Sequence, residues 1–171
     1  IDNLLKGGRE FRGTLYPGLM IVDGEPYVLE FNARFGDPEI EALLPLLPSN
    51  VDFFKLLFSA AKGNIYKSGF LKTKKASVVV TLASSGYPIA YKKGIIIEGL
   101  NKKFPSSVIV FHAGTKKTDS WYETSGGRVL MITAVADNLA SARRKAYKVI
   151  GKHGIYFKGM HYRQDIGSRK R

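Results

Sequence analysis

The chain has 171 residues, of which 44% are hydrophobic and 12% aromatic, enough for one ordinary core or two small ones. It has no cysteine, which excludes disulfides, thiolate zinc sites and a cysteine nucleophile. No apolar run approaches the roughly 20 residues of a membrane helix and no signal-like segment opens the chain, so we expect a cytoplasmic protein. The net charge of +13 favours an anionic partner, either nucleic acid or a phosphorylated small molecule.

The first elements are predicted to be a helix end and a β-hairpin. Residues Asp2 to Lys6 are typical of a last helical turn, which the next two glycines terminate, so we expect the sequence to begin inside a domain. Phe11 to Val22 is predicted to be a strand with a glycine break. Pro26 to Phe31 returns as its antiparallel partner after a turn at Asp23-Gly24.

Two helices and a linker are predicted next. The first helix runs from Asp37 to Leu47, with Asp37 as N-cap and Pro38 at the first helical position. The second runs from Asn50 to Lys62, where apolar side chains follow helical spacing. Gly63 to Lys75 is rich in Gly, Lys and Ser and lacks periodicity, which indicates a linker. We therefore divide the chain into domains at residues 1–70 and 71–171.

The second domain is predicted to be rich in β-structure, with one packing helix. The expected strands are Ala76 to Ala83, Gly94 to Ile97, Val108 to His112 and Arg128 to Val135. A helix capped by Asp137 or Asn138 follows, and we expect it to pack across the small sheet. Its apolar face comprises Leu139, Ala142, Ala146 and Val149. The predicted fold class is α+β.

The densest cluster of polar residues lies at the end of the second strand. Because side chains alternate along a strand, Glu30, Asn32 and Arg34 are expected on one face. Glu30 and Asn32 offer the oxygen ligands that suit Mg²⁺, and Arg34 can hold a phosphate or carboxylate by two hydrogen bonds. The helix amino terminus near Asp37 offers N–H groups to the same anion. A structural alternative is a Glu30–Arg34 salt bridge, with Asp37-Pro38-Glu39 only capping a helix.

Two motifs in the first half resemble those of one enzyme family. GTLYPGLM at Gly13 to Met20 and LEFNARFGDPE at Leu29 to Glu39 are similar to the end of the ATP-grasp domain of glycinamide ribonucleotide synthetases. Other ATP-grasp enzymes, such as biotin carboxylase, resemble them more loosely. The resemblance continues through four further motifs, SSGYP at Ser84 to Pro88, FHAGT at Phe111 to Thr115, GGRVL at Gly126 to Leu130 and RQDIG at Arg163 to Gly167. It therefore covers almost the whole chain.

The resemblance implies a fold and a set of site residues. Residues 1–70 would be the C-terminal portion of an ATP-grasp lobe, and residues 71–171 the family's small C-terminal domain. By this resemblance, Glu30 and Asn32 would bind the Mg²⁺ or Mn²⁺ that accompanies ATP. The strand Thr14 to Met20 lacks the extra acidic metal ligand that some ATP-grasp enzymes place there, so the ion would depend on Glu30 and Asn32. The residues that would seat glycine and its acyl phosphate are Arg34, Asp37, Pro38 and Glu39.

The second domain adds further candidates for substrate binding. Gly114 and Thr115 would present backbone donors towards the active-site cleft. Arg128 would present its guanidinium to an anion, but an ordinary surface loop explains Arg128 equally well. His112 is interpreted as a hydrogen-bonded structural residue. Trp121 and Tyr122 are interpreted as a loop that packs onto the sheet.

The implied reaction joins glycine to 5-phosphoribosylamine with ATP, through glycyl phosphate, in de novo purine synthesis. An ATP-grasp site also needs a glycine-rich loop, adenine contacts and lysines that this sequence does not show. We therefore expect the chain alone to be inactive and to depend on the missing N-terminal part of the same enzyme.

Two alternatives remain open at this stage. The first is another ATP-grasp ligase or carboxylase, which the RFGDPE run after Asn32 argues against. The second is a noncatalytic basic module that binds nucleic acid or another anion, favoured only by the charge of +13. Such a module needs basic residues interleaved with exposed aromatic side chains, which the predicted pattern lacks. We therefore expect neither a nucleic acid nor a membrane as partner.

Overall fold

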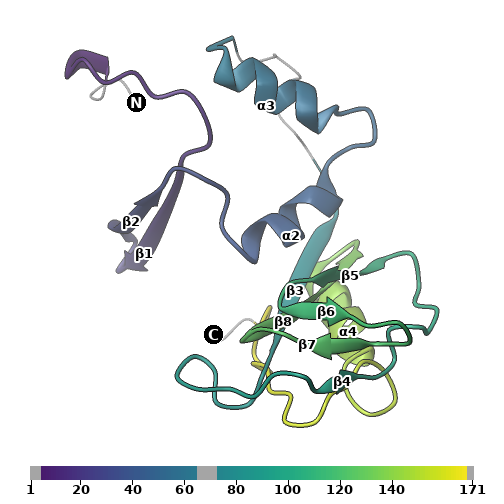
Figure 1. Cartoon of the computed structure of the whole chain (residues 1–171). Helices are drawn as coiled ribbons and strands as arrows, with labels where there is room; N and C mark the ends of the chain where they lie inside the picture. Colours follow the sequence, from purple (N-terminus) through teal and green to yellow (C-terminus); the bar gives the residue numbers. More distant parts are fainter. Residues whose placement is uncertain (1–4, 65–72, 169–171) are drawn as a thin grey trace. The chain divides into compact units, whose positions relative to one another are not determined.

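The chain forms two compact units (Figure 1). The computed structural model describes residues 5–64 and 73–168, so most of the predicted linker at Gly63 to Lys75 lies outside the described residues. No helix in the described part is long and apolar enough to cross a membrane. The first unit comprises Ile1–Ile40 and Leu47–Lys72, and the second comprises Glu41–Leu46 and Thr73–Arg171.

The first unit contains the predicted antiparallel hairpin. Strand β1 (Tyr16–Val22) pairs with β2 (Glu25–Asn32) across a turn at Asp23-Gly24, where both residues have positive φ. Such a two-residue turn matches the right-handed twist of the flanking strands. The prediction that β1 starts at Phe11 is wrong, because Gly13 takes a φ of 147° and interrupts the extended chain.

A β-bulge in β2 determines which side chains share a face of the hairpin. Gly18 lies opposite Glu30, but the next residue, Leu19, lies opposite Val28, so the register skips Leu29. Residues directly opposite each other in an antiparallel pair share a face. The site face therefore carries Tyr16, Gly18, Met20, Val22, Glu25, Tyr27, Glu30 and Asn32. The apolar face carries Pro17, Leu19, Ile21, Pro26, Val28 and Phe31.

The first predicted helix is shorter than expected. Helix α2 (Glu39–Leu43) continues into the 3₁₀ turn η1 (Leu44–Leu46), which contains Pro45. Asp37 and Pro38 are joined by a cis peptide bond and form a turn before the helix. The prediction that Pro38 is the first helical residue is therefore wrong.

The second predicted helix is confirmed, with a later start. Helix α3 (Phe53–Ala61) begins after Asp52, whose side chain accepts a hydrogen bond from the backbone N–H of Lys55 at 2.9 Å. Gly63 follows its C-terminus with a φ of 79°, a conformation that favours glycine after a helix.

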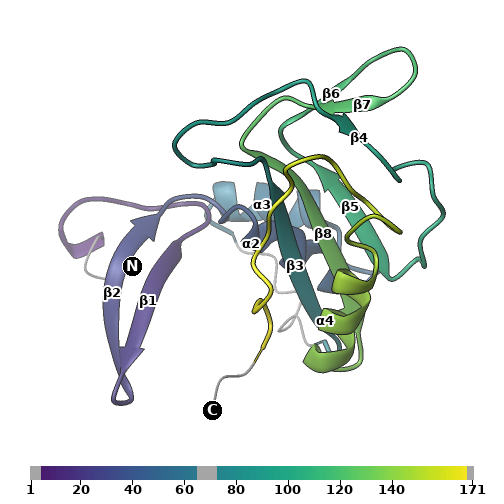
Figure 2. The same cartoon turned by 90° about the horizontal axis from the view of Figure 1, so that it is seen from below.

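The second unit is built on a three-stranded antiparallel sheet in the order β3-β8-β5, with β3 (Ala76–Ala83), β5 (Val108–His112) and β8 (Arg128–Ala136). Its strands lie where the apolar runs predicted them. Helix α4 (Leu139–Lys148) lies along β3 and β8 (Figure 2) and buries Ala142 and Ala146. Asn138 is the N-cap, because its side chain accepts from the backbone N–H of Ser141.

A second small sheet has the order β4-β7-β6, with β4 (Ile96–Ile97), β6 (Thr115–Lys117) and β7 (Tyr122–Thr124). Sequence reasoning missed β6 and β7, because these short polar strands lack an alternating apolar pattern. The interpretation of Tyr122 as part of a loop is wrong, since it lies in β7 with its ring centroid 4.7 Å from that of His112.

Two hydrogen bonds attach the segment Glu41–Leu46 to the second unit. The buried Oγ1 of Thr133 donates to the carbonyl oxygen of Glu41 at 3.0 Å. The Oγ of Ser77 donates to the carbonyl oxygen of Ala42 at 2.6 Å. These bonds place the segment with the second unit, although it precedes α3 in the sequence.

Candidate metal and substrate site

Glu30 and Asn32 lie together on the site face of the hairpin. They stand opposite Gly18 and Tyr16, respectively. A Cβ atom on Gly18 would lie only 3.0 Å from the Cγ of Glu30, so the glycine leaves room for the glutamate side chain to cross the strand. Glu30 is exposed and Asn32 is half-buried. The hairpin therefore presents one carboxylate and one amide oxygen on the same surface.

Arg34 lies outside the strand. Because β2 ends at Asn32 and residues 33–34 form a bend, the prediction that Arg34 shares the strand face with Glu30 and Asn32 is wrong. Its Nη1 donates to the carbonyl oxygen of Phe35 at 2.9 Å. The ion pairs of the described chain do not join Arg34 to Glu30, so the salt-bridge alternative is not supported. The guanidinium is exposed.

Tyr16 is a member of this cluster that sequence reasoning missed. Burial raises the pKa of its phenol, and the charge of Glu39, a hydrogen bond to Glu39 and the charge of Glu30 raise it further. The Glu39 side chain folds back over Gly36, where a Cβ atom would overlap its carboxylate. Tyr16 belongs to the site because it lies opposite Asn32 in the hairpin. This pairing depends on the β-bulge, which the sequence did not predict.

The cluster suits a cation with few protein ligands. Two carboxylates, Glu30 and Glu39, lie near the phenol of Tyr16. Among the described residues, no group of three or more His, Asp and Glu side chains could hold a metal ion. Mg²⁺ commonly takes only one or two protein carboxylates and completes its shell with water and phosphate oxygens. The pair Glu30 and Asn32 fits this coordination preference.

The amino terminus of α2 is a weaker anion site than predicted. The helix has only five residues, and the N–H of Ile40 already donates to the carbonyl oxygen of Gly36 at 3.0 Å. Asp37 is exposed in the turn, next to the half-buried Pro38. A short helix with an occupied donor has little to offer a phosphate.

In the second unit, the FHAGT and GGRVL motifs touch through their backbones. Gly114 donates its N–H to the carbonyl oxygen of Arg128 at 2.9 Å, and Thr115 donates to that of Ala113 at 2.9 Å. The expectation that Gly114 and Thr115 present free backbone donors to a ligand is therefore not met. A Cβ atom on Gly114 would lie 2.6 Å from the Cα of Gly126, so glycine is required for this contact.

The SSGYP motif packs against the same turn. Ser84 donates its N–H to the carbonyl oxygen of Gly127 at 2.8 Å and its Oγ to that of Gly126 at 2.9 Å. A Cβ atom on Gly127 would overlap the ring of Tyr87. Three motifs far apart in the sequence thus converge at the start of β8, where the half-buried Arg128 is placed.

His112 takes part in local structure. Its Nδ1 lies 2.9 Å from the Oγ1 of Thr115, and its ring lies against that of Tyr122. Thr115 thereby helps to fix the ring orientation. These contacts agree with the interpretation of His112 as a structural residue.

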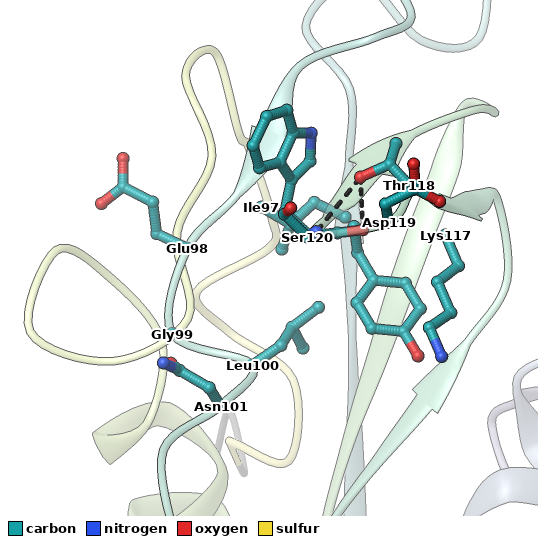
Figure 3. Close-up of a pocket in the computed structure, with 11 residues that line it drawn as sticks. Ile97, Glu98, Gly99, Leu100, Asn101, Lys117, Thr118, Asp119 and Ser120 are labelled. Atoms are coloured by element: carbon teal, nitrogen blue, oxygen red, sulfur yellow. Dashed lines mark hydrogen bonds between the residues drawn. The ribbon is translucent and has the colours of Figure 1, made fainter.

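Three open cavities in the described part of the second unit are lined by residues other than Gly114, Thr115 and Arg128. One of about 450 Å³ lies between residues 97–101 and 117–122 (Figure 3). The side chain of Thr118 makes two hydrogen bonds to the backbone of Trp121, which also lines this cavity. The carboxylate of Glu98 points away from Lys117 (Figure 3). Another cavity, of about 690 Å³, adjoins the SSGYP motif at residues 84–86.

Comparison with known families identifies both halves of the chain. The family model described as "Phosphoribosylglycinamide synthetase, C domain" matches residues 77–169. The model described as "Phosphoribosylglycinamide synthetase, ATP-grasp (A) domain" matches residues 1–40, which include the hairpin.

Similar proteins include phosphoribosylamine–glycine ligases and a trifunctional purine biosynthetic protein. The chain is 44% identical over 165 residues to the phosphoribosylamine–glycine ligase of Caldanaerobacter subterraneus, covering 96% of this chain and 38% of the relative. It is 44% identical over 168 residues to that of Synechocystis, covering 97% and 39%. It is 43% identical over 170 residues to the trifunctional purine biosynthetic protein adenosine-3 of Gallus gallus, covering 99% and 17%.

A solved structure agrees with these sequence matches. The crystal structure of the phosphoribosylamine–glycine ligase from Thermotoga maritima matches with a TM-score of 0.77 at 37% identity, covering 95% of this chain and 39% of that one. The chain thus spans less than two fifths of the bacterial ligases that it matches. With matches to the C domain over 77–169 and to the ATP-grasp domain over 1–40, the chain belongs to the phosphoribosylglycinamide synthetase family.

Proposed function

We propose that this chain is the metal-binding and C-terminal part of a phosphoribosylamine–glycine ligase. The observation that carries the proposal is the placement of Glu30 and Asn32 on one face of a hairpin that lies within the ATP-grasp match. The same matches support assigning residues 1–70 to the ATP-grasp domain and residues 71–171 to the C-terminal domain.

Glu30 and Asn32 would hold Mg²⁺ or Mn²⁺ through one carboxylate and one amide oxygen. The metal would neutralise negative charge on the nucleotide phosphates during phosphoryl transfer. Gly18 keeps the path of the Glu30 side chain open, and the charge of Glu39 adds to the attraction for a cation. Hard oxygen donors are the ligands that both ions accept.

The reaction would proceed in two balanced steps. A carboxylate oxygen of glycine attacks the γ-phosphorus of ATP, an O–P bond forms, and ADP leaves with the bridging oxygen. The amine nitrogen of phosphoribosylamine then attacks the glycyl carbon, a C–N bond forms, and phosphate leaves as the amine loses a proton. Catalysis of this kind depends on positioning and charge neutralisation, and no covalent enzyme intermediate is needed.

The chain's own side chains have distinct parts in this proposal. Arg34, which is exposed and donates to the carbonyl oxygen of the neighbouring Phe35, would bind the carboxylate or acyl phosphate of the glycyl group. The carboxylate of Glu39 lies near the phenol of Tyr16. Together with Asp37 and Pro38, Glu39 would shape the glycine pocket. Arg128 would bind an anionic substrate group. Gly114 and Thr115 would hold the loop that carries it.

The chain alone is proposed to be inactive, because the remaining part of the ligase would supply the other contacts to ATP and phosphoribosylamine. The proposal is best tested in a chimera, in which this chain replaces the matching 165 residues of the Caldanaerobacter ligase. ADP release by the chimera should require ATP, glycine and phosphoribosylamine together. A folded chimera that releases no ADP with all three would contradict the proposed activity.

The metal pair is tested in the same chimera. Glu30→Gln and Asn32→Ala should each raise the Mg²⁺ concentration needed for half-maximal activity by at least about tenfold. Glu25→Gln is the matched control, because Glu25 lies on the same face of β2 at the far end, beside the turn. Activity that ignores both site changes, or that responds equally to the control, would remove the metal assignment.

A further inference from the structure

The RQDIG motif at Arg163 to Gly167 has no part in the proposed reaction, yet two side chains of α4 hold its backbone. Tyr147 donates its Oη–H to the carbonyl oxygen of Arg163 at 2.7 Å and accepts from the backbone N–H of Ile166 at 3.2 Å. Arg143 donates to two carbonyl oxygens of the motif, through Nε at 3.1 Å and through Nη2 at 2.6 Å. These bonds fix the motif against the helix.

The motif belongs to a segment, residues 161–168, that we call the strap. The strap is drawn in yellow and runs beside β3 (Figure 2). The guanidinium of Arg143 lies 4.8 Å from the ring centroid of Tyr147, so the two side chains that hold the strap also support each other. Gly167 has a φ of 69°, and a Cβ atom there would lie 3.1 Å from a methyl group of Val78 in β3. The strap is therefore fixed between α4 and the sheet.

The charged side chains of the motif pair with each other. Arg163 donates through Nε and Nη2 to the two carboxylate oxygens of Asp165, at 2.9 and 2.6 Å. Such a bidentate pair has defined geometry and neutralises both charges locally. The motif is therefore better suited to shaping the strap than to binding an anion itself.

The strap reaches the sheet at Ala83, the last residue of β3. His161 and Ala83 exchange two backbone hydrogen bonds, at 2.9 and 3.0 Å. On its other side, Ala83 lies opposite Arg128, because the register of β3 and β8 shifts after Leu82. The carbonyl oxygen of Arg128 also accepts from the N–H of Gly114. The backbone of Arg128 is thus held in a row of segments that ends at the strap.

We propose that the strap is a positioning element for Arg128, and that Arg143 and Tyr147 are the positioning residues that hold the strap. This inference rests on the proposed function, in which Arg128 binds an anionic substrate group. His161 lies two residues before Arg163, so a strap released from α4 would also lose its hold on Ala83. Arg128 would then start from a less ordered backbone, and ordering it on binding weakens affinity for the substrate.

Three variants of the 171-residue chain test this coupling. Arg143→Gln removes the guanidinium that donates to the strap, and Tyr147→Phe keeps the ring but removes the hydroxyl. Arg144→Gln is the matched control, because Arg144 is the exposed neighbour of Arg143 and donates to Ser141 within the same helix. Tyr147→Phe decides the test if Arg143→Gln does not fold.

The first readout is amide hydrogen exchange followed by NMR. In Arg143→Gln and Tyr147→Phe, the N–H groups of Ala83 and Gly114 should exchange about tenfold faster or more, because they donate to the strap and to Arg128. The N–H of Val135, at the far end of β8, should change by less than about twofold. Arg144→Gln should leave all three within about twofold of wild type.

The second readout separates a positioning role from a general loss of stability. In the chimera, Arg128→Gln should raise the KM of the substrate that Arg128 binds, and Tyr147→Phe should raise the same KM by about fivefold with kcat within about twofold. Once Arg128 has been replaced, Tyr147→Phe should add less than about twofold, since coupled residues have non-additive effects.

Three results would overturn the inference. They are unchanged exchange at Ala83 and Gly114 in Tyr147→Phe, an equal acceleration in Arg144→Gln, and independent effects of Tyr147→Phe and Arg128→Gln on KM. Hydrogen exchange requires no turnover, so the test is separable from the ligase proposal. Accelerated exchange in the chain, with a folded chimera that releases no ADP, would support the positioning of Arg128 by the strap and contradict the proposed activity.

Discussion

The contact between Gly114 and the turn at Gly126 makes the sharpest stability prediction. In Gly114→Ala, the new Cβ would lie 2.6 Å from both the carbonyl oxygen of Arg128 and the Cα of Gly126. These are backbone atoms, so the two loops must separate. The shift would weaken the bond from Gly114 to Arg128 at 2.9 Å and the bond from Ser125 to Gly114 at 2.7 Å.

The size of the effect follows from these contacts. Two weakened hydrogen bonds cost about 1 kcal/mol each, and overpacking adds about 1 to 3 kcal/mol. We expect Gly114→Ala to lower the free energy of unfolding by about 3 to 5 kcal/mol. For a unit of this size, each kcal/mol lowers the melting temperature by roughly 4 to 8 °C.

Tryptophan fluorescence is the appropriate assay, because the chain has one tryptophan, Trp121, and it lies in the second unit. Gly126→Ala is the matched control. Its Cβ would approach only the Cα of Gly114, at 3.0 Å, with the next atom at 3.6 Å, so we expect a loss below about 1 kcal/mol. Equal losses in the two variants, or a loss below about 1 kcal/mol for Gly114→Ala, would refute the reasoning.

Three further predictions concern other parts of the chain. Thr133→Val removes the buried hydroxyl that donates to the Glu41 carbonyl, so thermal unfolding followed by Trp121 should show a loss of about 1 to 3 kcal/mol; an unchanged midpoint would contradict this. Burial raises the pKa of Tyr147 above 10.0, so its contribution to stability is complete below pH 10.0 and is lost as the pH rises through the raised pKa. Tyr147→Phe should therefore flatten part of the alkaline decline in melting temperature, and parallel curves would contradict the linkage. In the chimera, deleting Phe31 puts Asn32 on the other face from Glu30 and should reduce activity by about a hundredfold, whereas deleting the skipped Leu29 keeps their shared face and should have a smaller effect.

Apolar patterns predicted the second unit well. Strands β3 and β5 have the predicted bounds, and α4 buries Ala142 and Ala146 as its periodicity indicated. These elements have continuous apolar runs or a helical stripe, so local sequence and tertiary burial agree. Strands β6 and β7 have no such pattern, because hydrogen bonds to their neighbours determine them.

The candidate site was predictable only in part. The alternation of Glu30 and Asn32 is a local property and was predicted from the strand alone. The residues that lie opposite each other across the hairpin could not be predicted, because a regular two-residue turn would place Gly18 opposite Leu29 rather than Glu30. Arg34 was misplaced because the end of β2 depends on pairing, which stops at Tyr16 and Asn32.

The hydrogen bonding of the glycine motifs could not be predicted from the sequence either. Gly114 and Thr115 were expected to offer their N–H groups to a ligand, but the fold provides acceptors at Arg128 and Ala113. Those acceptors come from tertiary contact and a local turn, which composition and spacing do not reveal.

The most direct test of the proposed ligase is the fate of a carboxylate oxygen of glycine. The chimera is supplied with glycine labelled with ¹⁸O in its carboxylate, together with ATP, phosphoribosylamine and Mg²⁺, and the released phosphate is analysed by mass spectrometry. If glycyl phosphate forms and the amine then displaces phosphate, each released phosphate carries one labelled oxygen. Unlabelled phosphate from an active chimera would contradict the proposed chemistry.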